Sequence, residues 1–191
     1  AQNKIKKIIF ASSAAVYGDC KDLPITEDSK TEPLSPYGAS KLSAENEIKN
    51  YAKEFGFDAI ILRLFNVYGV GQNDLYSGVI SIFLKNIAQN KPLVIYGDGE
   101  QTRDFVSIYD IVQAFDCAIL SNGVKTYNIA SGRSVSINKL CEILLTGEKF
   151  KVIYKKQKKG DIKNSVADVT LAEKELGFSA KRLLQDECSK L

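Results

Sequence analysis

The chain has 191 residues, 45% of them hydrophobic and 26% charged, a composition typical of globular proteins and unlike disordered or fibrous ones. Its net charge of +3 is too small to predict binding to nucleic acid or to a membrane, and its length allows one large domain or two small ones. Histidine is absent, which excludes Ser-His-Asp and Cys-His mechanisms and His-ligated metal sites.

Proton transfer in such a chain must therefore use Tyr, Lys, Cys or a carboxylate. The four cysteines are scattered without paired spacing, so we expect no metal site and a reduced, cytoplasmic compartment. No apolar run approaches the ~20 residues that span a bilayer.

Short apolar runs alternate with amphipathic stretches along the chain. In order, the pattern predicts a strand over 7–12, a helix over 37–55, a strand over 59–64, a helix over 79–90, strands over 93–96 and from 105, a helix over 109–121, a strand over 126–129, a helix over 137–145, a strand within 149–163, and short helices near 170–176 and 182–190. Alternating strands and helices are typical of an α/β fold with a parallel sheet and right-handed crossovers.

Tyr37 and Lys41 lie four residues apart at the start of a predicted helix, about 40° apart around its axis and one turn along it. A nearby ammonium favours a phenolate, and such a tyrosine can take a proton from a hydroxyl group. The spacing alone is weak evidence, because it occurs three times and about once is expected by chance. Only this pair both begins a convincing helix and follows a serine pair, Ser12 and Ser13, at the end of a buried strand, where α/β sheets gather their sites. The alternative is a solvated pair on the helix surface.

Three segments carry a family resemblance: 10–18 (FASSAAVYG), 35–41 (SPYGASK) and 62–69 (LRLFNVYG). In this order they resemble the extended short-chain dehydrogenase/reductases, specifically NAD-dependent nucleotide-sugar epimerases of the UDP-glucose and UDP-N-acetylglucosamine 4-epimerase type. Segments 97–105 (GDGEQTRDF) and 160–162 (GDI) extend the resemblance almost to the end of the chain.

The resemblance implies three catalytic residues. Ser13 would bridge the sugar 4-hydroxyl and the tyrosine, Tyr37 would be the acid/base, and Lys41 would stabilise the phenolate and hold the nicotinamide ribose. Phe65 would lie beside the nicotinamide. NAD is thus the implied cofactor, contacted by Ser13, Tyr37, Lys41 and Phe65.

The resemblance also implies a set of residues that bind a UDP-sugar: Asn66 and Arg103 at the diphosphate, Val94 and Tyr96 at the uracil, Asp161 at a ribose, Lys158 where relatives usually carry arginine, and Ser165 facing the C2 substituent of the sugar. A guanidinium suits phosphate oxygens because its fork of donors is fixed. Alternative interpretations are a strand edge for Val94, a turn residue for Asp161, a polar loop residue for Ser165, and a solvated surface for the lysines of 155–159.

The implied reaction is 4-epimerisation of a UDP-hexose through a 4-keto intermediate, with UDP-glucose, UDP-galactose and the N-acetylated forms as substrates. Dehydratase relatives carry an extra acid/base pair directly after the serine or threonine, where this chain has Ala14 and Ala15. Water elimination is therefore disfavoured. Two alternatives are a UDP-glucuronate 4-epimerase and a non-catalytic remnant that binds a sugar nucleotide.

The chain departs from the family at its front. A dinucleotide-binding half should begin with a strand, a glycine-rich turn and a helix, and this sequence begins at what resembles the fourth strand. We therefore expect a fragment that is inactive by itself and that forms a homodimer through the 37–55 helix when full-length.

The fold expected from the resemblance is the C-terminal part of a Rossmann-type parallel sheet with a smaller α/β substrate-binding domain. Residues 1–70 would form the partial Rossmann domain, and 101–129 would return to it. Residues 71–100 and 130–191 would form the substrate domain.

Overall fold

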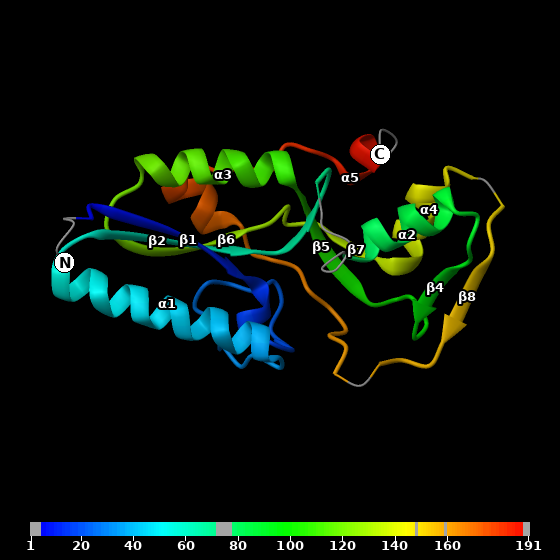
Figure 1. The fold of residues 1–191 in the computed structure, drawn as a ribbon, viewed down its shortest axis with the longest axis horizontal. Coiled ribbons are helices and arrows are strands. Elements are labelled where there is room, and N and C mark those ends of the chain that lie inside the picture. Colours follow the sequence, from blue (N-terminus) through cyan, green and yellow to red (C-terminus); the bar gives the residue numbers. More distant parts are fainter. Residues whose placement is uncertain (1–4, 72–77, 148, 159, 189–191) are drawn as a thin grey trace.

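The computed structural model describes residues 5–71, 78–147, 149–158 and 160–188. Two units lie side by side along the longest axis of the molecule, one around a parallel sheet and one around a strand pair with its helices (Figure 1). No helix in the described part of the chain is long and apolar enough to cross a membrane.

The sheet of the first unit consists of β1 (Lys7–Ser13), β2 (Asp58–Leu64) and β6 (Val124–Ile129), all parallel and in the order β1-β2-β6. Ser13 pairs with Leu64, and Leu64 pairs with Ile129, so the strands end at the same level. Parallel strands buried on both faces are rich in continuous apolar residues, as β2 is. The carboxyl ends of the three strands therefore lie together at one edge of the sheet.

Helices cover both faces of this sheet. α1 (Pro36–Phe55) lies on one face, and α3 (Ile108–Leu120) lies on the other with η3 (Ala172–Leu176) (Figure 1). Ser35 caps α1, Pro36 takes its first position, and Gly56 ends it in the left-handed conformation with φ 69°. These are the residues that local preferences favour at helix ends.

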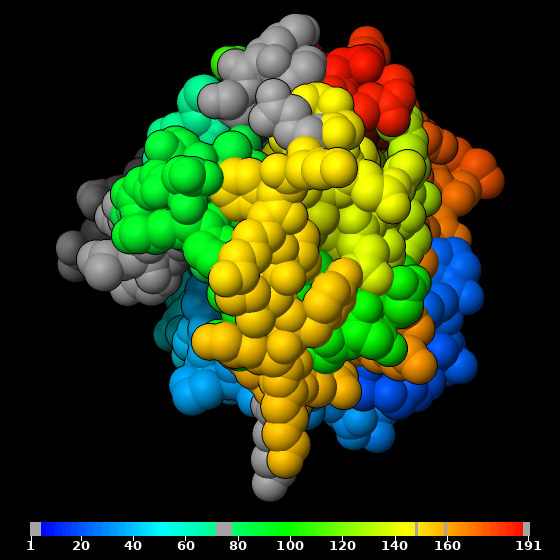
Figure 2. Space-filling view, turned by 90° about the vertical axis from the view of Figure 1, so that its right-hand side faces the viewer, coloured from blue at the N-terminus to red at the C-terminus, as the bar shows by residue number. Residues whose placement is uncertain are grey.

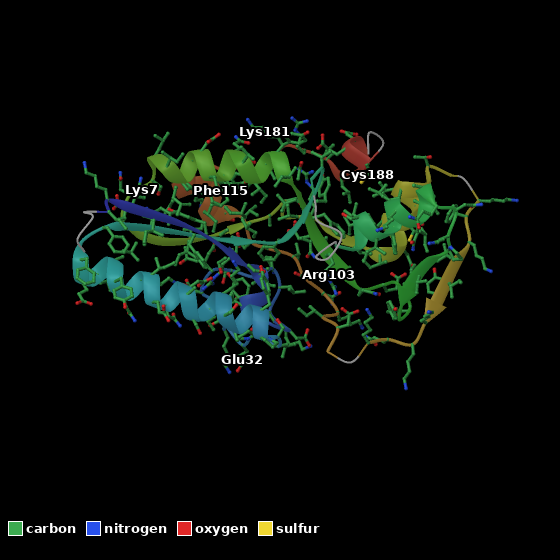
Figure 3. All side chains as sticks on the ribbon, viewed as in Figure 1. Lys7, Glu32, Arg103, Phe115, Lys181 and Cys188 are labelled. Carbon is green, nitrogen blue, oxygen red and sulfur yellow. The ribbon has the colours of Figure 1, made fainter. Side chains whose placement is uncertain are left out.

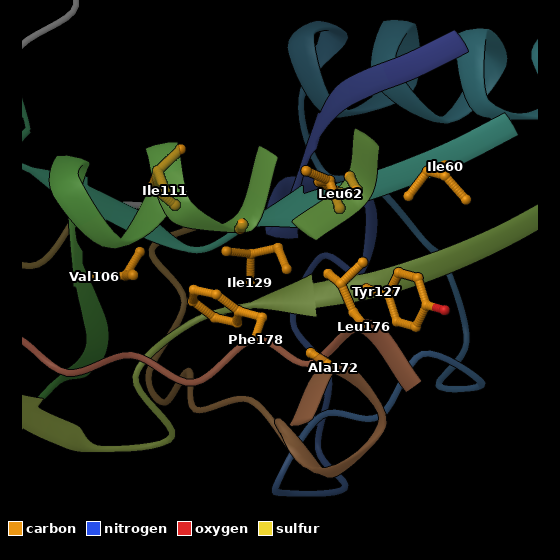
Figure 4. Close-up of a cluster of buried hydrophobic side chains, with 11 residues drawn as sticks. Ile60, Leu62, Val106, Ile111, Tyr127, Ile129, Ala172, Leu176 and Phe178 are labelled. Atoms are coloured by element: carbon orange, nitrogen blue, oxygen red, sulfur yellow. The ribbon is translucent and has the colours of Figure 1, made fainter. Parts of the chain in front are cut away.

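The main core lies between the sheet, α3 and η3, as Figure 4 shows. Its buried residues are Ile60, Leu62, Val106, Ile111, Ala114, Ala118, Tyr127, Ile129, Ala172, Leu176 and Phe178. The last three belong to a segment that we assigned from the sequence to the substrate domain. In the structure their apolar side chains are buried in the same cluster as residues of β2 and β6.

The second unit pairs β4 (Leu93–Tyr96) with β8 (Val152–Lys155) in parallel. α2 (Val79–Ala88), α4 (Ile137–Leu145) and the short α5 (Leu184–Cys188) enclose its core. Figure 2 views this end of the molecule, where the yellow segment of β8 and the residues after it run down the middle of the face and project below it.

A small sheet joins the two units. In it β5 (Thr102–Ser107) pairs with β3 (Asn66–Tyr68) in parallel and with β7 (Ser134–Ser136) in antiparallel fashion. The buried carboxylate of Asp104 accepts hydrogen bonds from the backbone N–H groups of Ser131, Gly132 and Ala167 at 2.8, 3.0 and 3.2 Å. Burial raises the pKa of Asp104, and these hydrogen bonds oppose the increase.

The elements expected from the sequence are confirmed to within a few residues, except that positions 189–190 of the last expected helix lie outside the described residues. The α/β fold with a parallel sheet is confirmed as well. The structure adds three elements of three residues each: the 3-10 helix η1 (Ala14–Val16), β3 and β7. Such short pieces show no periodicity in sequence, because their pairing comes from tertiary contacts.

Candidate active site

Ser13 ends β1 at the carboxyl edge of the sheet. Its Oγ accepts a hydrogen bond from the backbone N–H of Ala15 at 3.1 Å, so the side chain caps η1. The turn that follows is compact, and Val16 and Tyr17 at its end are buried. The hydroxyl of Ser13 is thus held at a fixed place at the end of a buried strand.

The first turn of α1 packs directly on this turn. A Cβ atom at Gly38 would lie 2.5 Å from the carbonyl oxygen of Ala15 and 3.0 Å from the Cβ of Pro33. Only a residue without a side chain allows this approach. Gly38 thereby brings Tyr37, its neighbour, close to the Ser13 turn.

Lys41 is held between α1 and β1. Its Nζ donates a hydrogen bond to the carbonyl oxygen of Ala11 at 2.9 Å and lies 5.7 Å from the centre of the Tyr37 ring. It also lies 5.0 Å from the centre of the Phe10 ring. Tyr37 itself is 56% exposed, so its phenol is open to a ligand.

Two adjoining cavities lie at this side of the molecule, and Ser13 lines the smaller one. The smaller, about 180 Å³, is lined by residues that include Ser13, Phe65 and Ser165. The larger, about 420 Å³, is lined by residues that include Val94, Tyr96, Lys158 and Asp161. Both cavities share Asn66 and Arg103.

Nine of the eleven residues singled out in the sequence line these two cavities. The other two, Tyr37 and Lys41, lie on α1, whose first turn packs on the turn after Ser13. The cavities place Arg103 at their junction; Figure 3 labels this side chain between the two units.

The guanidinium of Arg103 makes an ion pair with Asp161, with Nη2 and Oδ1 2.7 Å apart. Its Nη1 donates to the carbonyl oxygen of Thr102 at 2.8 Å. Burial lowers the pKa of Arg103, and Asp161 opposes that decrease. A guanidinium held in this way still has donors for an anion in either cavity.

The larger cavity also brings a cation onto an aromatic ring. The Nζ of Lys158 lies 4.0 Å from the centre of the Tyr96 ring, within the range of a cation–π interaction. Gln101, which the sequence analysis did not single out, lines the same cavity and donates through Nε2 to the carbonyl oxygen of Tyr96 at 2.7 Å. Aromatic, amide and cationic groups thus converge where a base and a phosphate could both bind.

Sequence reasoning also missed the buried charges behind the site. Glu45 on α1 is 0% exposed and Arg63 on β2 is 4% exposed, and the two form an ion pair with Nη2 and Oε2 2.7 Å apart. One signal was present: Glu45 continues the spacing of four that joins Tyr37 and Lys41, so all three share one stripe of the helix.

Known proteins resemble this chain in sequence and in fold. Residues 1–130 match the model of the NAD dependent epimerase/dehydratase family. The chain belongs to this family.

Two curated relatives are similar to this chain over most of the length of the chain. One is a putative UDP-glucose 4-epimerase of Methanocaldococcus jannaschii, 40% identical over 88% of this chain and 56% of its own length. The other is a dTDP-4-dehydro-6-deoxyglucose reductase of Escherichia coli, 37% identical over 100% of this chain and 61% of its own length. The chain therefore spans somewhat more than half the length of these relatives.

Solved structures of other proteins are also similar to most of this chain. The UDP-N-acetylglucosamine 4-epimerase of Methanobrevibacter ruminantium, in complex with UDP-N-acetylmuramic acid, has a TM-score of 0.90 and 38% identity, covering 98% of this chain and 62% of that one. The UDP-glucuronic acid 4-epimerase of Bacillus cereus, in complex with UDP-glucuronic acid and NAD, has a TM-score of 0.89 and 34% identity, covering 97% and 60%.

The cofactor of the family is NAD. The residues of this chain fit its nicotinamide end, because the ammonium of Lys41 is bound to Ala11 of β1, Phe65 lines a cavity with Ser13, and Tyr37 is exposed in the first turn of α1. A glycine-rich turn between a strand and a helix, which would hold the pyrophosphate, does not occur in the sequence of this chain.

We predict that Gly38→Ala lowers the free energy of unfolding by about 1–3 kcal/mol, because the added methyl group has no room against the backbone of η1. Urea denaturation of the whole protein that carries this chain measures the change. Ser43→Ala, on the exposed side of the same helix, is the control and should change the value by no more than ~0.5 kcal/mol. Equal stability of the two variants would contradict the close contact.

Proposed function

We propose that this chain carries the catalytic and sugar-nucleotide-binding residues of an NAD-dependent UDP-hexose 4-epimerase. One observation supports this most strongly: a cavity of sugar size beside Ser13 adjoins a larger, cation-lined cavity, and Arg103 lies at their junction. A diphosphate would bind at this junction, between a hexose in the smaller cavity and a nucleoside in the larger one.

The larger cavity suits a uridine diphosphate. Arg103 and Lys158 supply positive charge for the diphosphate, and Asn66 supplies an amide. Asp161 would accept a hydrogen bond from a ribose hydroxyl while it holds Arg103 in place. Val94 and Tyr96, at the wall formed by β4, would line the base.

In the proposed reaction Tyr37 takes the proton of the sugar 4-hydroxyl, with the Oγ of Ser13 bridging the two oxygens. Lys41 stabilises the phenolate. When bound, NAD supplies the acceptor and then the donor of the hydride at C4. The 4-keto sugar must rotate between the two transfers, which calls for a cavity that binds its ring loosely and the diphosphate firmly.

The wall of the smaller cavity favours epimerisation over water elimination. Ala14 and Ala15 lie there and carry no group that could transfer a second proton. Among the described residues that line this cavity, the cation is Arg103, and in this proposal its free donors are taken by the diphosphate. A neutral hexose therefore suits this cavity better than a uronate, whose carboxylate would require its own cationic partner.

We expect Tyr37→Phe to lower kcat for epimerisation by about 100-fold or more, because a general base typically contributes that much. Binding of UDP-sugar should stay within a few-fold, since no residue of α1 lines the larger cavity. Turnover of UDP-glucose and calorimetry with UDP, both on the whole protein, measure the two effects. Activity above about a tenth of wild type would remove Tyr37 from the mechanism.

We further propose that Ser165 admits an N-acetyl group at C2 of the sugar. It is small, 8% exposed, and lines the smaller cavity together with Ser13. The similarity to a UDP-N-acetylglucosamine 4-epimerase supports the same substrate class.

The change Ser165→Tyr should reduce turnover of UDP-N-acetylglucosamine at least tenfold more than turnover of UDP-glucose, because the ring would fill the space for the acetamido group. Ser165→Ala is the matched control, and it should leave the ratio of the two rates unchanged. An equal loss with both sugars in the tyrosine variant would refute the assignment.

A homodimer through α1 is the proposed assembly. Tyr51 and Phe55, at the end of this helix, are 53% and 50% exposed and stack with ring centres 5.9 Å apart. Light scattering of the whole protein should give a dimer, and Tyr51→Glu with Phe55→Glu should give a monomer. Leu120→Glu on α3, at an 81% exposed position, is the control that should leave the dimer intact. A wild-type protein that is monomeric at micromolar concentration would contradict the proposal.

A further inference from the structure

α1 carries both proposed catalytic side chains but few apolar anchors. All of its residues are described, and those fully buried are Gly38, Glu45 and Ala52. Two of these are small, and the third is a carboxylate. Most surface helices are held by a stripe of large apolar side chains. In α1 the partly buried Leu42 packs against a core cluster, and polar contacts to the sheet add to it.

Those contacts are polar and join α1 to consecutive residues of β1. Lys41 binds the carbonyl oxygen of Ala11, and one turn further along α1 the Oε1 of Glu45 accepts a hydrogen bond from the Oγ of Ser12 at 2.5 Å. Ser13 is the next residue of the strand. Two members of the stripe of Tyr37, Lys41 and Glu45 thus bind residues at the end of β1.

Arg63 holds the inner end of this stripe. It is the register partner of Ser12 on β2, so both side chains lie on the face of the sheet that α1 covers. Its Nε and Nη2 donate to the two carboxylate oxygens of Glu45 at 3.0 and 2.7 Å. This is the bidentate geometry that fixes direction as well as distance.

The remaining donors of Arg63 fix the loop after η1. Its Nη1 donates to the phenol oxygen of Tyr17 at 2.9 Å and to the carbonyl oxygen of Glu27 at 3.0 Å. Tyr17 in turn donates to the Oδ1 of Asn128 on β6 at 2.6 Å. The ion pair therefore joins α1 to all three strands of the sheet and to the turn that carries Ser13.

A buried ion pair is a poor source of stability. Replacing such a pair by apolar side chains of similar volume is often neutral or stabilising, because two charges have lost their water. What an apolar pair would not supply is direction, since apolar contacts allow a helix to slide or rotate on a sheet. Lys49, 3.7 Å from Glu45 and half-buried, adds a further positive charge beside the carboxylate.

We infer that Glu45 and Arg63 are positioning residues. They set the distance between Ser13 and the Tyr37–Lys41 pair by fixing the position of α1 on β1. The inference rests on the proposed function for its catalytic consequence. Neither side chain touches either cavity. The pair acts only through the helix that it holds.

The test compares two variants of the whole protein that carries this chain. Glu45→Gln keeps the shape of the side chain and removes its charge. We expect kcat for UDP-glucose to fall about tenfold or more, as for other displacements of catalytic groups by a fraction of an ångström to 1 Å. KM should stay within about threefold, because no residue of α1 lines the larger cavity. Glu47→Gln, exposed on the same helix, is the matched control and should behave as wild type.

The second variant separates an effect on the position of α1 from an effect on the stability of the protein. It can be used even if Glu45→Gln folds poorly. Glu45→Leu combined with Arg63→Met replaces the charges by an apolar pair, and its melting temperature should lie near that of wild type. We expect kcat to remain at least tenfold low in this folded protein. Recovery of both the melting temperature and kcat would overturn the inference, as would a wild-type kcat in Glu45→Gln.

Hydrogen exchange of the backbone over residues 36–45 provides a readout that needs no activity. Exchange should be faster in the apolar double variant than in Glu47→Gln, because α1 would no longer be fixed on β1. Equal exchange in the two would count against the positioning of the helix. A wild-type protein with no epimerase activity on any UDP-hexose would instead refute the proposed function. Hydrogen exchange would still decide whether the ion pair fixes the position of α1 on β1.

Discussion

The buried ion pair between Glu45 and Arg63 is the interaction on which the arrangement of the site depends. Burial alone would raise the pKa of Glu45, but the hydrogen bonds from Arg63 and Ser12 outweigh it and hold the pKa below its usual range. Burial alone would lower the pKa of Arg63, and its bonds with Glu45 and Tyr17 reverse that effect. Both groups are therefore charged at neutral pH, and each needs the other.

This pairing explains how a helix with few apolar anchors can present a tyrosine and a lysine at a defined place. Gly38 allows the first turn of α1 to approach η1, and Glu45 fixes the helix two turns further along. Burial raises the pKa of Tyr17 to about 12, against the opposing effect of Arg63, so its phenol remains a neutral donor in this network. Tyr17 and Tyr37 are both tyrosines of motif segments, but only Tyr37 is exposed enough to meet a ligand.

A second ion pair, between Arg103 and Asp161, organises the other end of the site. It joins β5 to the segment after β8. The two paired residues are 58 positions apart in the sequence. Because Asp104, the next residue of β5, fixes the turn at 131–132, the guanidinium is attached to a rigid strand. This end of the site is thus built on one firm element, β5, and on one exposed segment that projects from the surface (Figure 2).

The local sequence determined the elements and where they end. The apolar runs of β1 and β2, the Ser35–Pro36 start of α1 and its Gly56 stop are short-range signals, and they predicted the observed bounds to within about a residue. The family motifs also indicated nine of the residues that line the two cavities. Motifs are local in the chain, so they identify candidate residues without showing what holds them.

Only the tertiary structure showed the residues that act between elements. In the sequence Glu45 is one of many charged helix residues, and it is buried because Arg63, 18 positions away on another element, lies opposite it. Residues 171–180 pack on the first unit because Leu176 and Phe178 find apolar partners on β2 and β6. Burial and pairing depend on contacts between distant parts of the chain, and periodicity within one element carries no record of them.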